Sequence, residues 1–488
     1  MLPQRSRQVL PTVHRAVDPG LGGLHLQVEE RKWPTVIVNK VLTSVVALAF
    51  FAAGCGGSAD TSTPATTAAP TTTATPTTTT ATPTTTTTTT ATPTTTVAPT
   101  TTATPTTTTA GPLSWPNDVG SSRFGVLGQE FEVPGGWIRP HPGEFLWSEI
   151  QPTSDRWDWG RIDWHVNTWQ DRRLAILGTL WPFAQWDQEN CHANDPEVRP
   201  VLRRLPTKLF APCDETKFVS WLTAVVERYD GDGVEDMPGL AYPIRHWEVA
   251  NEPSMQGGHG YFFQGTSADY LSILRLAFET ITTADPEATV LTGGQAGMQP
   301  SFTDFWTPVL ESATGFFHVG NIHSIGSDHS FFSDDYRALL DETGHAGAEY
   351  WITEALVSTW PEPGQMSPTG DELGQNTFTG FATAFADGAS RIFNVGPHDP
   401  TGGPGPESDS AFLLLAETVG DFTSASWAGE SLVRFDMPDG RTVYAAWGGA
   451  GLPDTVTGVV ETVGYDGTAG SADATGFSAS VPTLVTVE

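Results

Sequence analysis

The sequence predicts a (β/α)8 TIM barrel followed by a small C-terminal β-sandwich, and three features carry this prediction. Between residues 123 and 395, eight short apolar stretches can be counted, with helical patterns between them. Two stretches end in a glutamate, and these glutamates lie 102 residues apart, about three units of a barrel of roughly 250 residues. From residue 431 onward, short alternating stretches separated by turn signals replace this pattern.

The expected strands are apolar runs rich in β-branched and aromatic residues, as strands buried on both faces require. In the barrel they span 123–128, 136–139, 174–180, 244–250, 289–294, 319–324, 349–354 and 389–395. Helices with one apolar side are expected at 218–229, 270–282 and 411–419. The sandwich strands are expected at 431–435, 442–447, 455–460 and 483–487.

The first 112 residues have the composition of an export signal and a stalk. Residues 41–53 form an uncharged apolar run, too short for the about 20 residues of a membrane-spanning helix but typical of a signal peptide. Small residues then precede Cys55, which resembles a bacterial lipobox in which this cysteine is lipidated; the alternative is an ordinary secretory signal cleaved nearby. Residues 61–112 are nearly all Thr, Pro and Ala and cannot bury a core.

These observations divide the chain into four parts. We expect a signal peptide with lipobox at 1–55, a disordered Thr/Pro-rich stalk at 56–112, the barrel at 113–420 and the sandwich at 421–488. The expected location is the extracellular face of the cell membrane, as a lipoprotein, or the surrounding medium. The formal net charge of −32 argues against a nucleic-acid partner, because phosphate binding requires a basic face.

The two glutamates are the strongest candidates for chemistry. Asn251 and Glu252 follow the strand at 244–250, and Pro253 ends it because proline has no N–H to donate to a sheet. Glu354 ends the strand at 349–354. The carboxyl ends of parallel barrel strands carry active sites, so both acids are expected at one mouth. An acid there can protonate a leaving oxygen, and an amide can hold a sugar hydroxyl.

At this point the sequence resembles clan A of the glycoside hydrolases, which are (β/α)8 retaining glycosidases such as β-galactosidases, β-xylosidases and cellulases. The resemblance rests on Asn251-Glu252-Pro253 after strand four and Ile352-Thr353-Glu354 at strand seven, and covers about residues 123–395. It implies that Glu252 is the acid/base, Glu354 the nucleophile, and Asn251 the group that holds the sugar 2-hydroxyl. It also places Arg139 beside the nucleophile and gives His323 a hydrogen bond to it; a surface ion pair and a satisfied loop histidine are the alternatives.

The resemblance fails at strand eight, where many clan members carry a tryptophan as a sugar platform. Here the strand ends in Phe393, Asn394 and Val395. Trp181 or Trp186, after strand three, could supply the platform instead; packing under the loop is the alternative. The loop at 187–216 holds Cys191 and Cys213, which outside the cytoplasm predict a disulfide, with zinc as the alternative.

The predicted function is therefore a retaining glycoside hydrolase that cleaves O-glycosidic bonds, expected to be β-linked, in extracellular oligo- or polysaccharides. No metal or organic cofactor is implied, and a monomer is expected. A non-catalytic, surface-displayed carbohydrate-binding lipoprotein is the competing class, and a transglycosylase would use the same residues. The sandwich either binds glycan or packs on the barrel. The sugar, the linkage and exo or endo action stay open.

Overall fold

The computed structural model describes residues 112–128, 133–140, 144–257, 260–326, 330–357, 368–395 and 405–488. The expected signal peptide, Cys55 and residues 56–111 of the expected stalk lie outside these ranges. Within these ranges, no helix is both long and apolar enough to cross a membrane.

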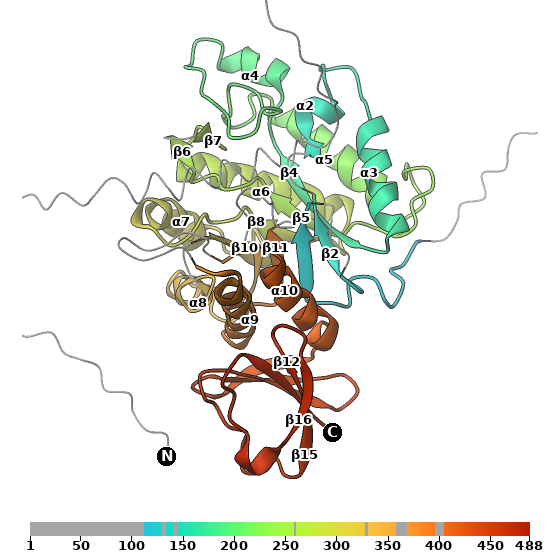
Figure 1. Ribbon diagram of the computed structural model, residues 1–488. Helices are drawn as coiled ribbons and strands as arrows, with labels where there is room; N and C mark the ends of the chain where they lie inside the picture. Colours follow the sequence, from blue (N-terminus) through green and yellow to red (C-terminus); the bar gives the residue numbers. More distant parts are fainter. Residues whose placement is uncertain are drawn as a thin grey trace, which may run out of the picture. The chain divides into compact units, whose positions relative to one another are not determined.

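Eight parallel strands close into a barrel with helices around it (Figure 1). They are β1 (Phe124–Leu127), β2 (Trp137–Arg139), β4 (Ala175–Trp181), β5 (His246–Val249), β8 (Thr289–Thr292), β9 (Val319–Ile325), β10 (Glu349–Leu356) and β11 (Arg391–Val395). Strands pair in chain order, and pairing of β1 with β11 closes the ring. The short β3 (Phe145–Leu146) adds to the carboxyl end of β4. The predicted (β/α)8 fold is confirmed.

The connecting helices bury one side against the strands. The longer ones are α3 (Gly160–Asp171), α5 (Glu215–Tyr229), α6 (Ser267–Ala284), α7 (Pro300–Ser312), α8 (Ser333–Glu342), α9 (Gly370–Ala386) and α10 (Pro406–Val419). The starts of α6 and α9 are fixed by capping boxes in which Thr266 pairs with Asp269 and Thr369 with Glu372, satisfying first-turn N–H groups. Short helices α2 (Trp147–Ile150) and α4 (Gln185–Cys191) and the hairpin β6 (Gln256–Gly257) and β7 (Gly260–Tyr261) lie in loops.

The C-terminal β region is one six-stranded antiparallel sheet, in the order β12-β13-β14-β17-β15-β16. Its elements are β12 (Ser424–Gly429), β13 (Leu432–Asp436), β14 (Thr442–Ala446), β15 (Val459–Gly464), β16 (Ala469–Asp473), the 3-10 turn η1 (Ala474–Gly476) and β17 (Thr483–Val487). Both faces bury apolar side chains: Val433 and Phe435 join the main core, while Leu432 and Tyr444 belong to a second cluster within the sheet region. The sheet thus packs on the barrel through one face.

The long loop after β4 is tied down at several points. Cys191 and Cys213 form the predicted disulfide. The buried Asp187 carboxylate accepts hydrogen bonds from the backbone N–H groups of Cys213 and Asp214. Lys208 donates to two backbone carbonyls of the same loop. Because the bridge takes up both thiols, the zinc alternative for these cysteines does not apply.

The barrel interior is built in two layers that follow from the two-residue period of strands. The lower layer, at the amino ends of the strands, is apolar and aromatic: Trp137, Leu177, His246, Val319 and Trp351. Two residues further along the same five strands lies the polar layer: Arg139, Thr179, Glu248, Asn321 and Thr353. All five polar residues are buried, and they form the floor beneath the mouth.

Candidate active site

Both predicted acids lie at the mouth of the barrel, close to each other. One carboxylate oxygen each of Glu252 and Glu354, together with a ring nitrogen of His323, lie within 4.8 Å of one another. All three side chains are at least nine-tenths buried. The two acids, which the sequence separates by 102 residues, are therefore brought face to face by the barrel.

A β-bulge explains how consecutive residues of β10 both reach the interior. The pairing of β10 with β9 shifts between Ile352, opposite Ile322, and Glu354, opposite His323, so that Thr353 is the extra residue. In a regular strand, neighbouring side chains point to opposite faces, and a bulge redirects them. Thr353 bonds within the polar layer while Glu354 bonds to Arg139. The bulge therefore adds Glu354 above the layer without removing Thr353 from it.

Just after β5, at the level of Glu354 in the barrel, the chain turns through strained backbone. Ala250 and Glu252 both have left-handed conformations, with φ of 66° and 42°, which side chains other than glycine rarely adopt. Each such residue costs on the order of 1–3 kcal/mol, and such strain tends to occur at functional sites. Here the turn brings Asn251 and Glu252 to the mouth directly after the last strand residue, Val249.

Arg139 connects the polar layer with the mouth. Its Nε donates to Glu248 Oε2 at 2.6 Å and its Nη2 to Glu248 Oε1 at 3.0 Å, while Nη1 donates to Glu354 Oε1 at 2.7 Å. Nη2 also donates to Asn251 Oδ1 at 2.6 Å. One fully buried guanidinium thus orients two carboxylates and one amide, which is the planar, multidentate recognition that arginine provides.

Glu248 is a third buried carboxylate, below the other two. Besides Arg139, it accepts hydrogen bonds from Thr179 Oγ1 at 2.7 Å and Asn321 Nδ2 at 2.6 Å. Burial alone would raise its pKa, but the charge of Arg139 and hydrogen bonds from His323 and Arg139 outweigh burial and lower the pKa to about 2. Glu248 is therefore ionised at any physiological pH.

His323 is held in its charged form between the acids. Burial would lower its pKa, but the charge of Glu354 and hydrogen bonds to Glu248 and Glu252 raise the pKa to about 9. The Nδ1–H of this imidazolium donates to Glu252 Oε1 at 2.9 Å, and Nε2–H donates to Thr353 Oγ1 at 2.8 Å. Thr353 then donates to Asn321 Oδ1, so a chain of bonds runs from the mouth to Glu248.

Glu252 and Glu354 have different surroundings. Burial raises the pKa of Glu252, and the negative charge of Glu354 raises it further, against the hydrogen bond from His323. Glu354 instead receives the guanidinium of Arg139. With Arg139 and His323 positive and Glu248 and Glu354 negative, the site is neutral when Glu252 carries its proton. A further buried negative charge would have no partner, so the geometry favours a protonated Glu252 beside an ionised Glu354.

The predicted site residues separate into two groups. Arg139, Asn251, Glu252, His323 and Glu354 form one hydrogen-bonded cluster, and His323 bonds to Glu252, with Glu354 3.6 Å from the same nitrogen. Their individual roles stay predictions.

The two tryptophans lie outside this cluster. Trp181 is fully buried against Phe262. Trp186 is half-buried, donates to the backbone oxygen of Gln151 and contacts Trp147. These contacts fit the alternative that the two tryptophans pack under the loop, and not that they form a sugar platform.

Sequence reasoning missed the polar layer itself. Thr179, Glu248 and Asn321 each interrupt an apolar strand. Each points into the barrel, just below the mouth. A polar residue within a strand buried on both faces needs an internal partner. That rule, applied to Glu248 in the stretch His-Trp-Glu-Val, could have indicated a buried ion pair, although not its partner.

The trio of Glu252, His323 and Glu354 has the residue types of a metal site. The charges around it do not suit a cation, because Arg139 already occupies Glu354 Oε1 and His323 carries a proton on the nitrogen that faces both acids. A metal would have to displace both interactions. The donor set therefore fits acid–base chemistry better than metal binding.

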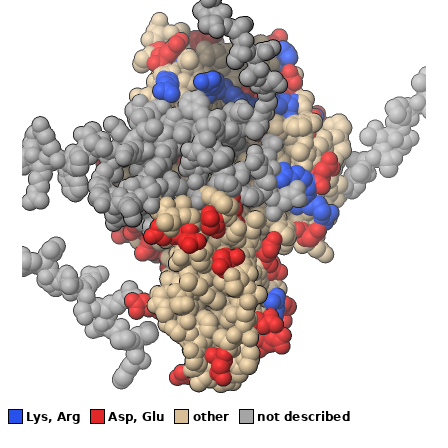
Figure 2. All heavy atoms as spheres, in the orientation of Figure 1, with Lys and Arg blue, Asp and Glu red and all other residues tan. Residues whose placement is uncertain are grey.

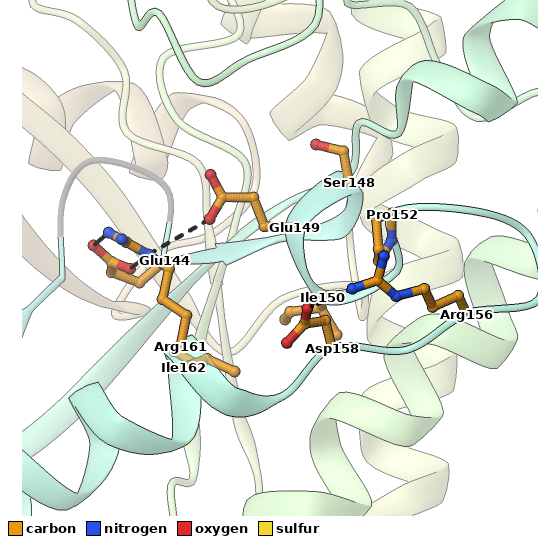
Figure 3. A pocket seen from close by; sticks show the side chains of 9 residues that line it. All are labelled: Glu144, Ser148, Glu149, Ile150, Pro152, Arg156, Asp158, Arg161 and Ile162. Atoms are coloured by element: carbon orange, nitrogen blue, oxygen red, sulfur yellow. Dashed lines mark hydrogen bonds and ion pairs between the residues drawn. The ribbon is translucent and has the colours of Figure 1, made fainter.

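A separate pocket of about 260 Å³ lies beside α2 and the start of α3 (Figure 3). Glu144 and Glu149 point into it, and Arg161 bonds to Glu144 and lies 3.5 Å from Glu149, as the dashed lines show. Arg204, from the long loop, also pairs with both acids. The charged groups of this pocket are thus paired with each other, and it contains none of the predicted site residues.

The sequence matches no protein-family model and no curated protein sequence. Among solved structures, the chain is similar to a glucosidase from Croceicoccus marinus, with 13% identity and a TM-score of 0.49 over 77% of this chain and 96% of the other. It is similar to a GH39 β-xylosidase from Caulobacter crescentus, with 14% identity and a TM-score of 0.49 over 78% and 98%. It is also similar to an α-L-arabinofuranosidase from Thermotoga maritima, with 11% identity and a TM-score of 0.48 over 77% and 97%. The activity of this chain therefore has to be argued from its site.

Proposed function

We propose that this protein is a glycoside hydrolase that works by double displacement, with Glu354 as nucleophile and Glu252 as acid/base. The observation that carries the proposal is the pair of buried carboxylates in opposite electrostatic surroundings, with oxygens within 4.8 Å. Retaining glycosidases hold their carboxyl groups about 5–5.5 Å apart, whereas inverting ones need about 6.5–9.5 Å to admit a water. The short gap supports retention of configuration.

In the proposed mechanism, Glu354 attacks the anomeric carbon while Glu252 gives its proton to the leaving oxygen. Arg139 lowers the energy of the ionised Glu354 before attack. Once Glu354 is bonded to the sugar, its charge is gone, and the pKa of Glu252 falls because one cause of its rise is removed. Glu252, a carboxylate after giving its proton to the leaving oxygen, can then take a proton from the incoming water, as the second step requires.

Asn251 is oriented to bind the substrate. Its Oδ1 accepts from Arg139, which turns the amide so that Nδ2 is its free end. The Nδ2 atom is buried and has no hydrogen-bond partner among the residues that the structure describes. An unpartnered buried donor beside two carboxylates supports the proposal that it donates to a sugar hydroxyl. The expected substrates are β-linked oligo- or polysaccharides.

The stereochemistry of the first-formed product tests this mechanism. Proton NMR during turnover of a chromogenic β-glycoside by the full chain should show the substrate's anomeric configuration in the product. Glu354→Gln should lose turnover with every leaving group. Glu252→Gln should still attack substrates whose leaving group needs no proton, then stall, and azide should release a glycosyl azide.

Glu311→Gln is the matched control, because it removes an exposed carboxylate on α7 far along the chain from both acids. It should behave as the unchanged protein. An inverted product, or normal turnover by either Glu252→Gln or Glu354→Gln, would contradict the assignment.

We further propose that the protein is exported and held at the outer face of the membrane by a lipid on Cys55, with residues 56–112 as the stalk. This proposal rests on the sequence alone, in which an apolar run is followed by small residues and a cysteine. Cys55→Ser should move the protein from the membrane fraction to the medium or leave it uncleaved. Unchanged membrane partitioning of this variant would remove the lipid anchor from the proposal.

A further inference from the structure

The loop between α5 and β5 gathers acids that have no role in the site described above. Glu227 lies in the last turn of α5 and is partly exposed, and Asp230 and Asp232 follow in the loop. One carboxylate oxygen of each of these three residues lies within 4.8 Å of the other two. Asp236 lies in the same loop and accepts from the N–H groups of Gly231 and Gly233.

These acids lack the positive partners that other acid clusters of this protein have. Within the part of the chain that the structure describes, none of Glu227, Asp230, Asp232 and Asp236 forms an ion pair. By contrast, Glu144 pairs with Arg161 and Arg204. Like charges at this spacing repel, so a compact arrangement without a cation is unfavourable.

Two buried carboxylates near this loop make few hydrogen bonds, and one of them, Asp285, has a buried oxygen without a partner among the described residues, which is an independent sign of a missing ligand. Asp230 is 6% exposed, and its only hydrogen bond within the described residues is to Oδ1, from the N–H of Asp232. Asp285, just after α6, is 7% exposed; Oδ1 accepts from Glu287 N–H, while Oδ2 is buried without a partner among the described residues.

Asp285 acts electrostatically on this cluster from a different element. Its charge and those of Glu227 and Asp232 act on one another. Arg245 also acts on Asp285, but its guanidinium is ion-paired with Glu287. A buried carboxylate oxygen with no donor is costly unless a cation or a bound water reaches it.

We propose that Glu227, Asp230 and Asp232 bind one divalent cation, Ca²⁺, with Asp285 reaching it through water. Ca²⁺ takes six to eight oxygen ligands and tolerates irregular geometry, whereas Mg²⁺ requires a near-octahedral set of ligands. Three carboxylates from a helix end and a flanking loop, with open solvent on the side of Asp232, suit the first ion. The ion would offset the repulsion that the structure otherwise leaves unbalanced.

The site would fix the point where the chain enters the barrel. The N–H of Leu113 donates to the carbonyl oxygen of Gly231, which lies between the two aspartates. Gly231 has a φ of 73°, and a Cβ there would meet the side chain of Leu113. Cation binding would therefore hold the loop that receives the first described residues, next to the expected stalk.

Calcium titration of the full chain, stripped with a chelator, tests the proposal. We expect one ion per chain by isothermal titration calorimetry, with a dissociation constant between about 10⁻⁵ and 10⁻³ M. Thermal unfolding should shift upward by about 2 °C or more at about 10 mM Ca²⁺. The shift with Mg²⁺ should be smaller, and a matched ionic strength of NaCl should not reproduce it.

Two variants identify the ligands. Glu227→Gln removes a side chain with no partner among the described residues, and Asp232→Asn keeps the oxygen that accepts from Val234 N–H, so both should fold. Each should lose the calcium-dependent shift. Glu235→Gln, an exposed acid of the same loop, should keep it.

The control matters because a chain with a net charge of −32, with acids spread over the face in Figure 2, attracts calcium weakly everywhere. An equal shift in Asp232→Asn and the unchanged protein, an equal shift with NaCl, or no shift at all would overturn the site.

Discussion

Two layers of the barrel, only two residues apart along the same strands, do opposite things. The lower layer is closed by aromatic contacts: Trp137 packs against His246 and Trp351 at centroid distances of 4.7 and 5.3 Å, and Arg391 stacks on both tryptophans. The polar layer carries ions and hydrogen bonds. Because the side chains of both layers are buried, apart from the half-buried His246, burial does not indicate which end of the barrel holds the candidate site. The candidate site is indicated instead by polar groups beside the mouth that are not all paired with one another, such as Asn251 Nδ2.

The lower layer shows how an inward-facing histidine behaves when no carboxylate contacts it. Burial lowers the pKa of His246 to about 3, helped by the charges of Arg391 and Arg245, so this histidine is neutral. The pKa of His323, which lies nearer the mouth on β9, two strands from β5, is raised to about 9 instead, against the effect of burial and chiefly by the charge of Glu354. The same residue type is thus an aromatic spacer in one layer and a cation in the other, according to the carboxylates near it.

Replacing Glu248 should show the difference between the two layers most strongly, because it should affect both stability and activity. Glu248→Gln leaves Arg139 with one buried carboxylate and should cost about 3–5 kcal/mol of unfolding free energy. It should also lower kcat, because Arg139 and the chain through Thr353 lose their anchor. Leu177→Ala in the lower layer is the matched control, with a similar loss of about 2–5 kcal/mol from a cavity.

The measurement is denaturant unfolding together with the pH profile of kcat/KM. The profile should shift in Glu248→Gln and keep its shape in Leu177→Ala. The same profile in both variants would mean that the polar layer only supports the fold.

The pH dependence of stability is a smaller effect with two limbs. Glu248 has a folded pKa of about 2 against an ordinary 4.5, so its contribution is full above about pH 4.5 and is lost as the pH falls toward 2. His323 has a folded pKa of about 9 against 6.5, so its contribution is full below about pH 6.5 and is lost as the pH rises through 9. Unfolding midpoints measured from pH 2 to 10 should show both limbs.

Variants assign each limb to its residue. Glu248→Gln should flatten the acid limb, and His323→Gln the alkaline limb. Acid and alkaline limbs that survive these substitutions would place the titrating groups elsewhere in the chain.

The sequence predicted all eight barrel strands because each is a mainly apolar stretch, interrupted in several strands by polar residues, that begins close to where the structure begins it; the run at 174–180, for example, is Ala175–Trp181. Strands β12 and β16 were not predicted, since Ser-Ala-Ser-Trp-Ala-Gly and Ala-Gly-Ser-Ala-Asp lack β-branched residues. Their pairing partners stabilise them as strands, and propensity does not report partners.

At the site, sequence patterns located the residues near the mouth and missed the polar residues deeper in the strands. Glu252 follows the end of β5, and Glu354 lies two residues before the end of β10. The contact of Arg139 with Glu248 joins residues 109 apart, and no local pattern encodes it. For Trp181, its place after an apolar run left a sugar platform and packing under the loop both open, and in the structure the ring packs in the core.

The bulge in β10 has a consequence for how this site could be lost. The strand is one residue longer than its ladder with β9 needs, so losing one residue between Ile352 and Glu354 would restore regular pairing rather than disturb it. The sheet would keep its hydrogen bonds, and Glu354 would take the place of Thr353 in the floor. An in-frame loss of the Thr353 codon would thus leave a folded barrel in which the second carboxylate no longer stands above the floor beside Glu252.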